Sequence, residues 1–319
     1  MLSTFAAHVG YLVPLRGPWG FSARRAAGRA LMSGPLTFQT PTALEYFATL
    51  VADDASLSLV EAGVSIAQDE FPQLDTQAVL AEIDALAAKL RRRFPADAVP
   101  VQRLRWLNRY FFQEIGFGGN ANDYYDPANS YLHKVLHTRR GIPITLALLY
   151  AELAAQIGLT AQGVSFPGHF LVKLRMPQGE VIVDPFTGQS LSRDALEQML
   201  VPYKRSSALA RFDAPLGLYL QAAPPRDVLA RMLRNLKEIH RSAEDWPRLL
   251  AVTQRLVILL PESWSERRDR GLAYAEMGFD AAAVEDLQTY FEQAPEAADR
   301  ETVAARLAQL SRGRSPRLH

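Results

Sequence analysis

Hydrophobic positions between residues 40 and 115 recur with the 3.6-residue period of an α-helix. Thr42 followed by Glu45 is the capping-box pattern that starts a helix, and residues 57–68 predict a second helix. Two further helices are predicted from the apolar positions Val79, Ile83, Leu86, Leu90, Leu104, Leu107, Phe111 and Ile115. The amino-terminal part of the molecule is therefore expected to be helical.

The pattern changes in the middle of the chain. Residues 120–140 are polar and aromatic and are predicted to form a loop, and residues 143–158 predict an apolar helix that starts at a proline and ends at a glycine. Three short β-strands are predicted at residues 162–166, 169–174 and 180–183. Residues 176–179 form a hairpin turn between the last two strands. A buried helix followed by antiparallel strands predicts an α+β fold.

Beyond about residue 224 the pattern is helical again. Pro261 and Pro295 are spaced by the 34 residues of a tetratricopeptide repeat, and residues 278–280 form the predicted turn between its two helices. Three signature offsets of the repeat are occupied by Gly271, Tyr274 and Ala283. Residues 230–261 fit the repeat poorly, and residues 301–310 are expected to form a capping helix. An all-α module of tetratricopeptide type is therefore predicted.

The first residues differ from the rest in charge. No acidic residue occurs before position 44, and the segment carries the basic residues Arg16, Arg24, Arg25 and Arg29. Such a composition is typical of an organellar transit peptide. The alternative, which we favour, is that residues 1–38 are disordered or a mis-assigned extension. Residues 312–319 are expected to form a basic tail.

Composition limits the classes of function. Hydrophobic residues make up 48% of the chain and charged residues 22%, and the formal net charge is +1. This balance gives no reason to expect a nucleic acid or a membrane as partner. No apolar run is long enough to span a bilayer. The chain has no cysteine, which excludes disulfides, thiolate metal sites and a cysteine nucleophile, and which fits a cytoplasmic location.

Two side chains at strand ends could carry chemistry. His169 begins one predicted strand and Asp184 ends the next, so both can lie at one end of the sheet within hydrogen-bonding reach. A carboxylate there would orient the imidazole, as in a nucleophile–His–Asp triad. The alternative is that this pair is a structural hydrogen bond with no reaction left to perform.

Three sequence blocks resemble the cysteine, histidine and aspartate blocks of the transglutaminase-like superfamily. They read RRGIPITLALLYAELAAQIGLTAQGV, GHFLVKL and VIVDPFTG. The longer pattern DPANSYLHKVLHTRRGIPITLALLY is similar to a divergent SirB-like branch, in which this papain-fold domain precedes tetratricopeptide-like helices. The resemblance implies a transglutaminase-like domain over 39–220, including the helical amino-terminal part, and a repeat module over 221–311. It places the family's histidine on His169 and its aspartate on Asp184.

The family's cysteine falls near Pro143 or Ile144, and neither side chain can act as a nucleophile. The nearest hydroxyl belongs to Thr145, on a different side of the helix, where a threonine is commonly only a first-turn residue. A hydroxyl also lacks the thiolate fraction that a thiol gains beside an imidazole. Cysteine-type acyl transfer is therefore not expected.

Further residues are candidates for the cleft or for metal binding. Asn129, Tyr131, Pro143 and Phe166 are expected to line the cleft. His133 and His137 have the i, i+4 spacing of two metal ligands, but the stretch lacks the adjacent glutamate of a zinc-protease motif and no third ligand is apparent. No metal and no cofactor is expected. The GFGG at 116–119 has no following lysine and is not a phosphate-binding loop.

Two functions remain open. The first is a non-catalytic scaffold or regulatory protein, which binds a protein partner through its repeat helices and a peptide or small ligand in the cleft. The second is a hydrolase or acyl-transfer enzyme that uses Thr145 or a water molecule with His169 and Asp184. We expect the first, because the missing cysteine removes the group on which the family's chemistry depends.

Overall fold

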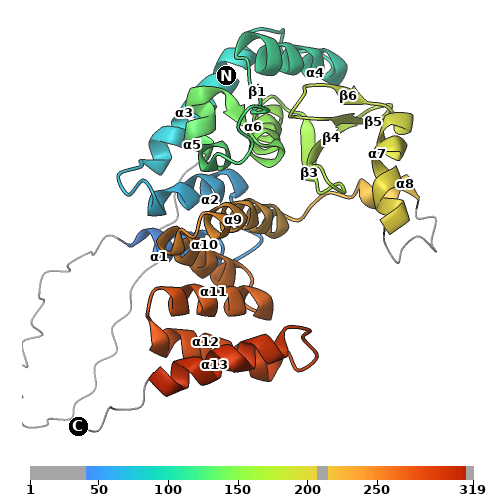
Figure 1. Cartoon of the computed structure of the whole chain (residues 1–319). Helices are drawn as coiled ribbons and strands as arrows, with labels where there is room; N and C mark the ends of the chain where they lie inside the picture. The colour runs from blue at the N-terminus through green and yellow to red at the C-terminus, as the bar shows by residue number, and fades with distance from the viewer. Residues whose placement is uncertain (1–40, 207–214, 314–319) are drawn as a thin grey trace, which may run out of the picture. The chain divides into compact units, whose positions relative to one another are not determined.

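The first described helix begins at the capping side chain that the sequence indicates. A computed structural model describes residues 41–206 and 215–313, with the side chains of 204–206 and 313 left aside (Figure 1). The hydroxyl of Thr42 accepts the Glu45 N–H at 3.2 Å, and the Glu45 carboxylate accepts the Thr42 N–H at 2.8 Å. This reciprocal pair satisfies two N–H groups at the start of α1 and confirms the predicted capping box.

The amino-terminal helices form one continuous core with the following domain. The elements of this part are α1 (Ala43–Leu50), α2 (Leu59–Ser65), a 3₁₀ turn (Ile66–Asp69), α3 (Thr76–Arg91), α4 (Pro100–Asn108) and a π-helical segment (Arg109–Glu114). The fourth predicted helix thus changes from α to π geometry at Arg109. Its apolar side chains Leu104, Leu107 and Phe111 are buried, as their spacing predicts.

The central domain is built around a helix that is buried on nearly every side. This helix, α6 (Pro143–Gln156), packs against α3 and against two strands of the sheet. The antiparallel sheet has the order β3 (Thr160–Val164), β4 (Leu171–Met176), β5 (Gly179–Val183) and β6 (Ser190–Leu191). Met176 pairs with Gly179 across the two-residue turn, which confirms the predicted hairpin. Two helices follow the sheet, α7 (Arg193–Ser206) and α8 (Leu216–Tyr219).

The strands differ from the predicted bounds for a local reason. The chain turns sharply after β3, where the Phe166 N–H donates to the Val164 carbonyl at 3.0 Å and the His169 N–H to the Phe166 carbonyl at 2.9 Å. Phe166 and His169 therefore lie in a turn and not in strands, although Phe166 is apolar. The predicted loop at 120–140 also contains short elements, namely β1 (Gly118–Gly119), a 3₁₀ turn (Pro127–Ser130), α5 (Leu132–Thr138) and β2 (Arg140–Gly141).

The carboxyl-terminal part consists of antiparallel helix pairs (Figure 1). They are α9 (Pro225–Ser242), α10 (Trp246–Leu259), α11 (Trp264–Glu276), α12 (Asp280–Gln293) and α13 (Arg300–Gly313). The turn between α11 and α12 contains Gly278 at φ +75°, as a repeat turn requires. The last helix extends to Gly313, so it includes the first two residues of the predicted basic tail. The predicted extension at residues 1–38 and the rest of the predicted tail, residues 314–319, lie outside the residues that the structure describes.

A buried ion pair joins the repeat helices to the amino-terminal layer. Arg255 of α10 is 0% exposed, and its guanidinium makes two hydrogen bonds to the Asp69 carboxylate, at 2.6 and 2.8 Å. The guanidinium also lies 4.8 Å from the ring centroid of Phe47. These contacts hold α10 against α1 and against the turn after α2, so they fix the first repeat helices on the amino-terminal helices.

A second polar cluster lies at the same junction. Glu70 accepts a hydrogen bond from the Tyr131 hydroxyl at 2.9 Å and pairs with Arg248 of α10 at 3.2 Å. His240, near the end of α9, is 3% exposed and its Nε2 has no hydrogen-bond partner. Burial lowers the pKa of His240 below its ordinary value, and the charges of Asp245 and Glu70 oppose that shift. The surroundings of His240 at this junction therefore favour its neutral form.

The α+β class is confirmed: helices precede and follow a small antiparallel sheet that packs on a buried helix. The boundary between 39–220 and 221–311 stays a prediction, because the hydrophobic core runs through both parts. Leu229, Leu233 and Leu236 of α9 belong to the same buried cluster as Leu146 of α6.

Removal of the charge of Asp69 should weaken the fold. Asp69→Asn leaves the buried Arg255 without a counter-charge, so we expect a loss of about 2–4 kcal/mol in the free energy of unfolding, measured in urea. The matched control is Asp54→Asn, which removes a carboxylate that is 73% exposed and pairs with Arg226. This control should cost no more than about 1 kcal/mol. Equal losses in the two variants would contradict a special role for the buried pair.

Acid should destabilise the protein through two histidines, the buried His240 and the half-buried His133. The pKa values of His240 and His133 are both lowered, mainly by burial, from an ordinary 6.5. The unfolded chain then binds more protons than the native state, so stability falls as the pH drops below about 6.5. His240→Leu should reduce the difference in melting temperature between pH 7.5 and 5.5. His137→Gln, at an exposed position of the same chain, should leave that difference unchanged. An undiminished difference in His240→Leu would refute this assignment.

Candidate functional site

The amino end of α6 carries no group that could act as a nucleophile at the positions where the resemblance places the cysteine. Ile142 is the N-cap residue and makes no side-chain cap hydrogen bond, and Pro143 occupies the first turn. Ile144 is 2% exposed. The helix therefore begins with three apolar side chains, and the partial positive charge of its first turn faces no capping side chain.

Thr145 lies one residue further along and is sealed inside the domain. Its side chain is 0% exposed, and its hydroxyl lies 2.8 Å from the Asn129 carbonyl and 3.0 Å from the Ile142 carbonyl, to either of which it can donate. A Cβ on Gly141 would come within 2.8 Å of the hydroxyl, so the glycine makes room for it. The hydroxyl thus ties α6 to the preceding turn.

His169 lies in the turn between β3 and β4, two residues before β4 begins. Its side chain is half-buried, and its backbone N–H holds the turn through Phe166. The preceding Gly168 has φ +70°, and a Cβ there would lie 1.8 Å from the Tyr203 hydroxyl of α7. Only glycine therefore fits before the histidine, both for backbone conformation and for space.

Asp184 lies just beyond β5, and its carboxylate shapes the turn that follows. One oxygen accepts the Phe186 N–H at 2.9 Å and the other accepts the Thr187 hydroxyl at 2.8 Å. The sheet register brings the His169 turn and Asp184 to the same end of β4 and β5. Among the hydrogen bonds of the described residues, none joins the two side chains. In this structure the Asp184 carboxylate therefore holds the turn that follows β5, and a bond between it and His169 stays a prediction.

The turn held by Asp184 places the ring of Phe186 against the backbone of Gly119. A Cβ on Gly119 would lie 2.3 Å from the Phe186 ring, and the Gly119 N–H donates to the Phe186 carbonyl at 2.9 Å. The same ring lies 6.1 Å from the ring of Tyr124. Gly119 therefore allows a close aromatic contact, and Gly118–Gly119 form the short strand β1.

The four residues expected to line the cleft have other positions. Asn129 is 3% exposed and its amide donates to the Asp123 and Tyr124 carbonyls, so it shapes the 120–130 loop. Tyr131 is buried, and its hydroxyl donates to the Glu70 carboxylate. Burial and, to a smaller extent, the negative charge of Glu70 raise the pKa of Tyr131. Phe166 is 1% exposed within a second apolar cluster under α7, and Pro143 is half-buried.

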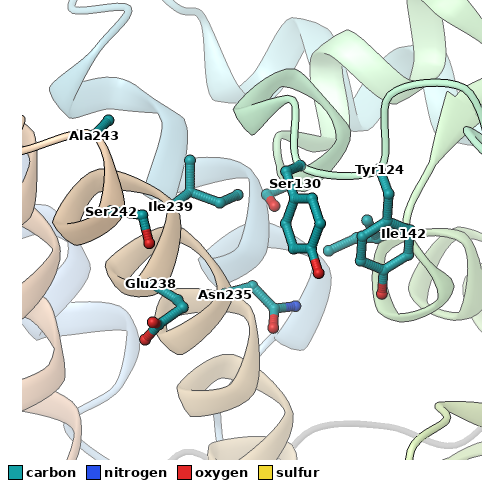
Figure 2. Close-up of a pocket in the computed structure, with 9 residues that line it drawn as sticks. Tyr124, Ser130, Ile142, Asn235, Glu238, Ile239, Ser242 and Ala243 are labelled. Carbon is teal, nitrogen blue, oxygen red and sulfur yellow. The ribbon is translucent and has the colours of Figure 1, made fainter.

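A pocket of about 600 Å³ opens beside the amino end of α6 (Figure 2). One wall comes from the central domain and the other from α9. The lining residues are Tyr124, Tyr125, Ser130, Ile142, Asn235, Glu238, Ile239, Ser242 and Ala243. None of the four expected cleft residues lines it, although Ser130 and Ile142 are neighbours of three of them. The α9 wall could not be expected from the sequence, because no local pattern places α9 against the α6 terminus.

A second groove of about 250 Å³ lies within the repeat helices. Its walls belong to α9, α10 and α11 and combine charged with apolar side chains. The lining residues are Lys237, Arg241, Trp246, Leu249, Asp269, Leu272, Ala273 and Glu276. Lys237 is fixed there by ion pairs to Glu266 at 2.6 Å and to Asp269 at 2.7 Å.

The two histidines of α5 have different surroundings. His133 packs edge-on against Phe71 with ring centroids 4.7 Å apart, whereas His137 is exposed. Among the residues that the structure describes, no three His, Asp or Glu side chains are placed to hold a metal ion. Within 41–206 and 215–313, no helix combines the length and apolarity needed to cross a membrane.

Comparison with known proteins agrees with both halves of the fold. A family model described as transglutaminase-like superfamily matches residues 77–234, and a tetratricopeptide repeat model matches residues 236–308. The second match begins within α9, so it includes the end of that helix and the whole of α10, in the stretch that fits the repeat poorly in sequence.

Several bacterial proteins are similar over most of this chain. A UPF0162 protein of Xylella fastidiosa is 36% identical and covers 82% of this chain and 93% of its own length. A UPF0162 protein of Vibrio cholerae is 27% identical over 84% of this chain and 97% of its own length. The protein SirB1 of Salmonella typhimurium is 27% identical over 76% of this chain and 87% of its own length. The chain therefore belongs to the UPF0162, or SirB-like, family, in which a transglutaminase-like domain precedes tetratricopeptide repeats.

Proposed function

We propose that this protein is a non-catalytic interaction module, in which the transglutaminase-like domain and the repeat helices bind other polypeptides. The observation that carries the proposal is the state of the α6 terminus. The resemblance places the family's cysteine near Pro143 or Ile144, and the hydroxyl of Thr145 is fully buried and bound to backbone carbonyls. A nucleophile must reach both its base and the substrate, and the Thr145 hydroxyl, the one nearest to the family's cysteine position, is held on backbone carbonyls instead.

The histidine and aspartate support the same proposal. A triad needs its carboxylate on the imidazole, where it fixes the tautomer and stabilises the charged form. Here the two oxygens of Asp184 accept hydrogen bonds from Phe186 and Thr187, and among the hydrogen bonds of the described residues none joins this carboxylate to His169. The aspartate can therefore be retained for the turn that it holds, without any reaction.

The two cavities support a binding role. The pocket at α6 and the groove on the repeat helices both combine apolar surface with polar side chains, which is typical of peptide-binding surfaces. Repeat helices commonly present such a surface to a protein partner. We infer that a protein partner is bound through α9–α11, with a peptide segment in the pocket.

The catalytic alternative is tested directly. The full chain is incubated with a glutamine peptide and a labelled primary amine, and separately with p-nitrophenyl acetate, alongside His169→Ala. We expect the wild type and the variant to show the same background rates. Turnover that exceeds background and disappears in His169→Ala would establish an enzyme and refute the proposal.

A structural role of Thr145 gives a separate expectation. Thr145→Val keeps the shape but leaves the Asn129 carbonyl without its hydroxyl donor, which should cost about 1–3 kcal/mol in the free energy of unfolding. The matched control is Thr138→Val, because the hydroxyl of Thr138 donates to the Lys134 carbonyl at an exposed position. That change should stay within about 0.5 kcal/mol. Chemical denaturation measures both, and an equally small loss in Thr145→Val would argue against the structural role.

A further inference from the structure

One face of α9 forms the wall of the α6 pocket and continues one turn beyond it. Asn235, Ile239 and Ser242 line the pocket, and Arg231 precedes Asn235 by four residues on the same face. In Figure 2 the side chain of Asn235 extends from α9 toward the wall that carries Tyr124. Burial raises the pKa of the Tyr124 hydroxyl, and the positive charge of Arg231 opposes that shift. Arg231 itself does not line the pocket; it lies one helical turn beyond Asn235 on the same face of α9.

Arg231 is a half-buried cation without a counter-charge. Its Nη1 donates to the Ser165 hydroxyl at 2.7 Å, and its guanidinium lies 5.3 Å from the ring centroid of Phe170. Among the described residues, no carboxylate forms an ion pair with it, in contrast to Arg226, Arg234 and Arg255. An unpaired guanidinium with free donors is a natural partner for a carboxylate or another planar anion.

Ser130 supplies a second, independent indication of a ligand. Its side chain is 1% exposed and lines the pocket, yet its Oγ has no hydrogen-bond partner. Buried hydroxyls in native proteins are nearly always paired, so this group is suited to a ligand atom. It lies beside the uncapped amino end of α6, where the helix dipole also favours an acceptor or a negative group.

The remaining lining groups fit a polypeptide chain. Asn235 is half-buried and has no side-chain hydrogen bond among those of the described residues, and a primary amide can both donate to and accept from a peptide unit. Ile142, Ile239 and Ala243 provide apolar surface, while Glu238 is neutralised by Arg241. The distance along α9 from Arg231 to Ser242 is about 16 Å, the length of roughly five extended residues.

We propose that this pocket binds the free carboxyl terminus of a partner protein. The terminal carboxylate pairs with Arg231, the main chain pairs with Asn235 and Ser130, and an apolar side chain near the end covers Ile142 and Ile239. The inference rests on the proposed binding function of this pocket and makes it specific, because it names the chemical group that the site selects.

The test uses the full chain and two peptide arrays. Each array contains every combination of the last two residues, once with a free carboxyl terminus and once as the terminal amide. We expect binding to free-acid peptides with apolar last residues, and a loss of roughly tenfold or more on amidation, as for other desolvated charge pairs. Arg231→Gln should abolish this preference, whereas Arg231→Lys should retain part of it.

Two controls separate binding from folding. Arg193→Gln removes the same charge from an exposed position on α7 and should bind as the wild type does. Thermal unfolding of Arg231→Gln should remain cooperative. Equal affinity for acids and amides, or full affinity in Arg231→Gln, overturns the carboxylate proposal while leaving a peptide pocket in place. Absence of binding to both arrays overturns the peptide pocket itself.

Discussion

The architecture depends on one desolvated ion pair, between Arg255 of α10 and Asp69 of the amino-terminal layer. A guanidinium that is wholly removed from water must find its counter-charge, and the partner here lies 186 residues earlier in the chain. That requirement fixes where α10 sits. Because α10 packs antiparallel to α9, it also fixes the position of α9 against the central domain. The α6 pocket requires α9 in this position, which the distant ion pair supports together with the core packing of Leu229, Leu233 and Leu236.

The helices and the hairpin could be predicted from the sequence because their signals are local. The capping pair Thr42 and Glu45, the apolar period of α3, and the turn at 176–179 each act over a few residues. The strand ends could not be placed, because Phe166 and Phe170 read as strand residues but pack from a turn. The change from α to π geometry at Arg109 likewise has no signal in the apolar pattern. Where tertiary packing decides the backbone, local pattern is insufficient.

In the candidate site, too, local features could be predicted from the sequence and tertiary placement could not. The resemblance located the α6 terminus, His169 and Asp184, and the structure places all three in one domain. It could not show that Asp184 bonds its own turn, because both a triad and a turn require the same residue at a strand end. The residues Asn235, Ile239 and Arg231 were missed entirely. Their signal was present as an i, i+4, i+8 stripe on α9, but such a stripe is equally typical of core packing. Only the tertiary placement of α9 distinguishes the two.

The position of α9 has a consequence for regulation. This helix contributes Asn235 and Ile239 to the α6 pocket, and Lys237 and Arg241 to the groove on the repeat helices. The two cavities therefore share α9 as a common wall, and the ion pair between Glu238 and Arg241 joins a residue of one cavity to a residue of the other. A ligand that tilts or rotates α9 from one side changes the geometry on the other. By thermodynamic reciprocity, each ligand then alters the affinity of the other by the same factor. If each cavity takes a ligand as proposed, α9 is the element through which binding on one side acts on the other.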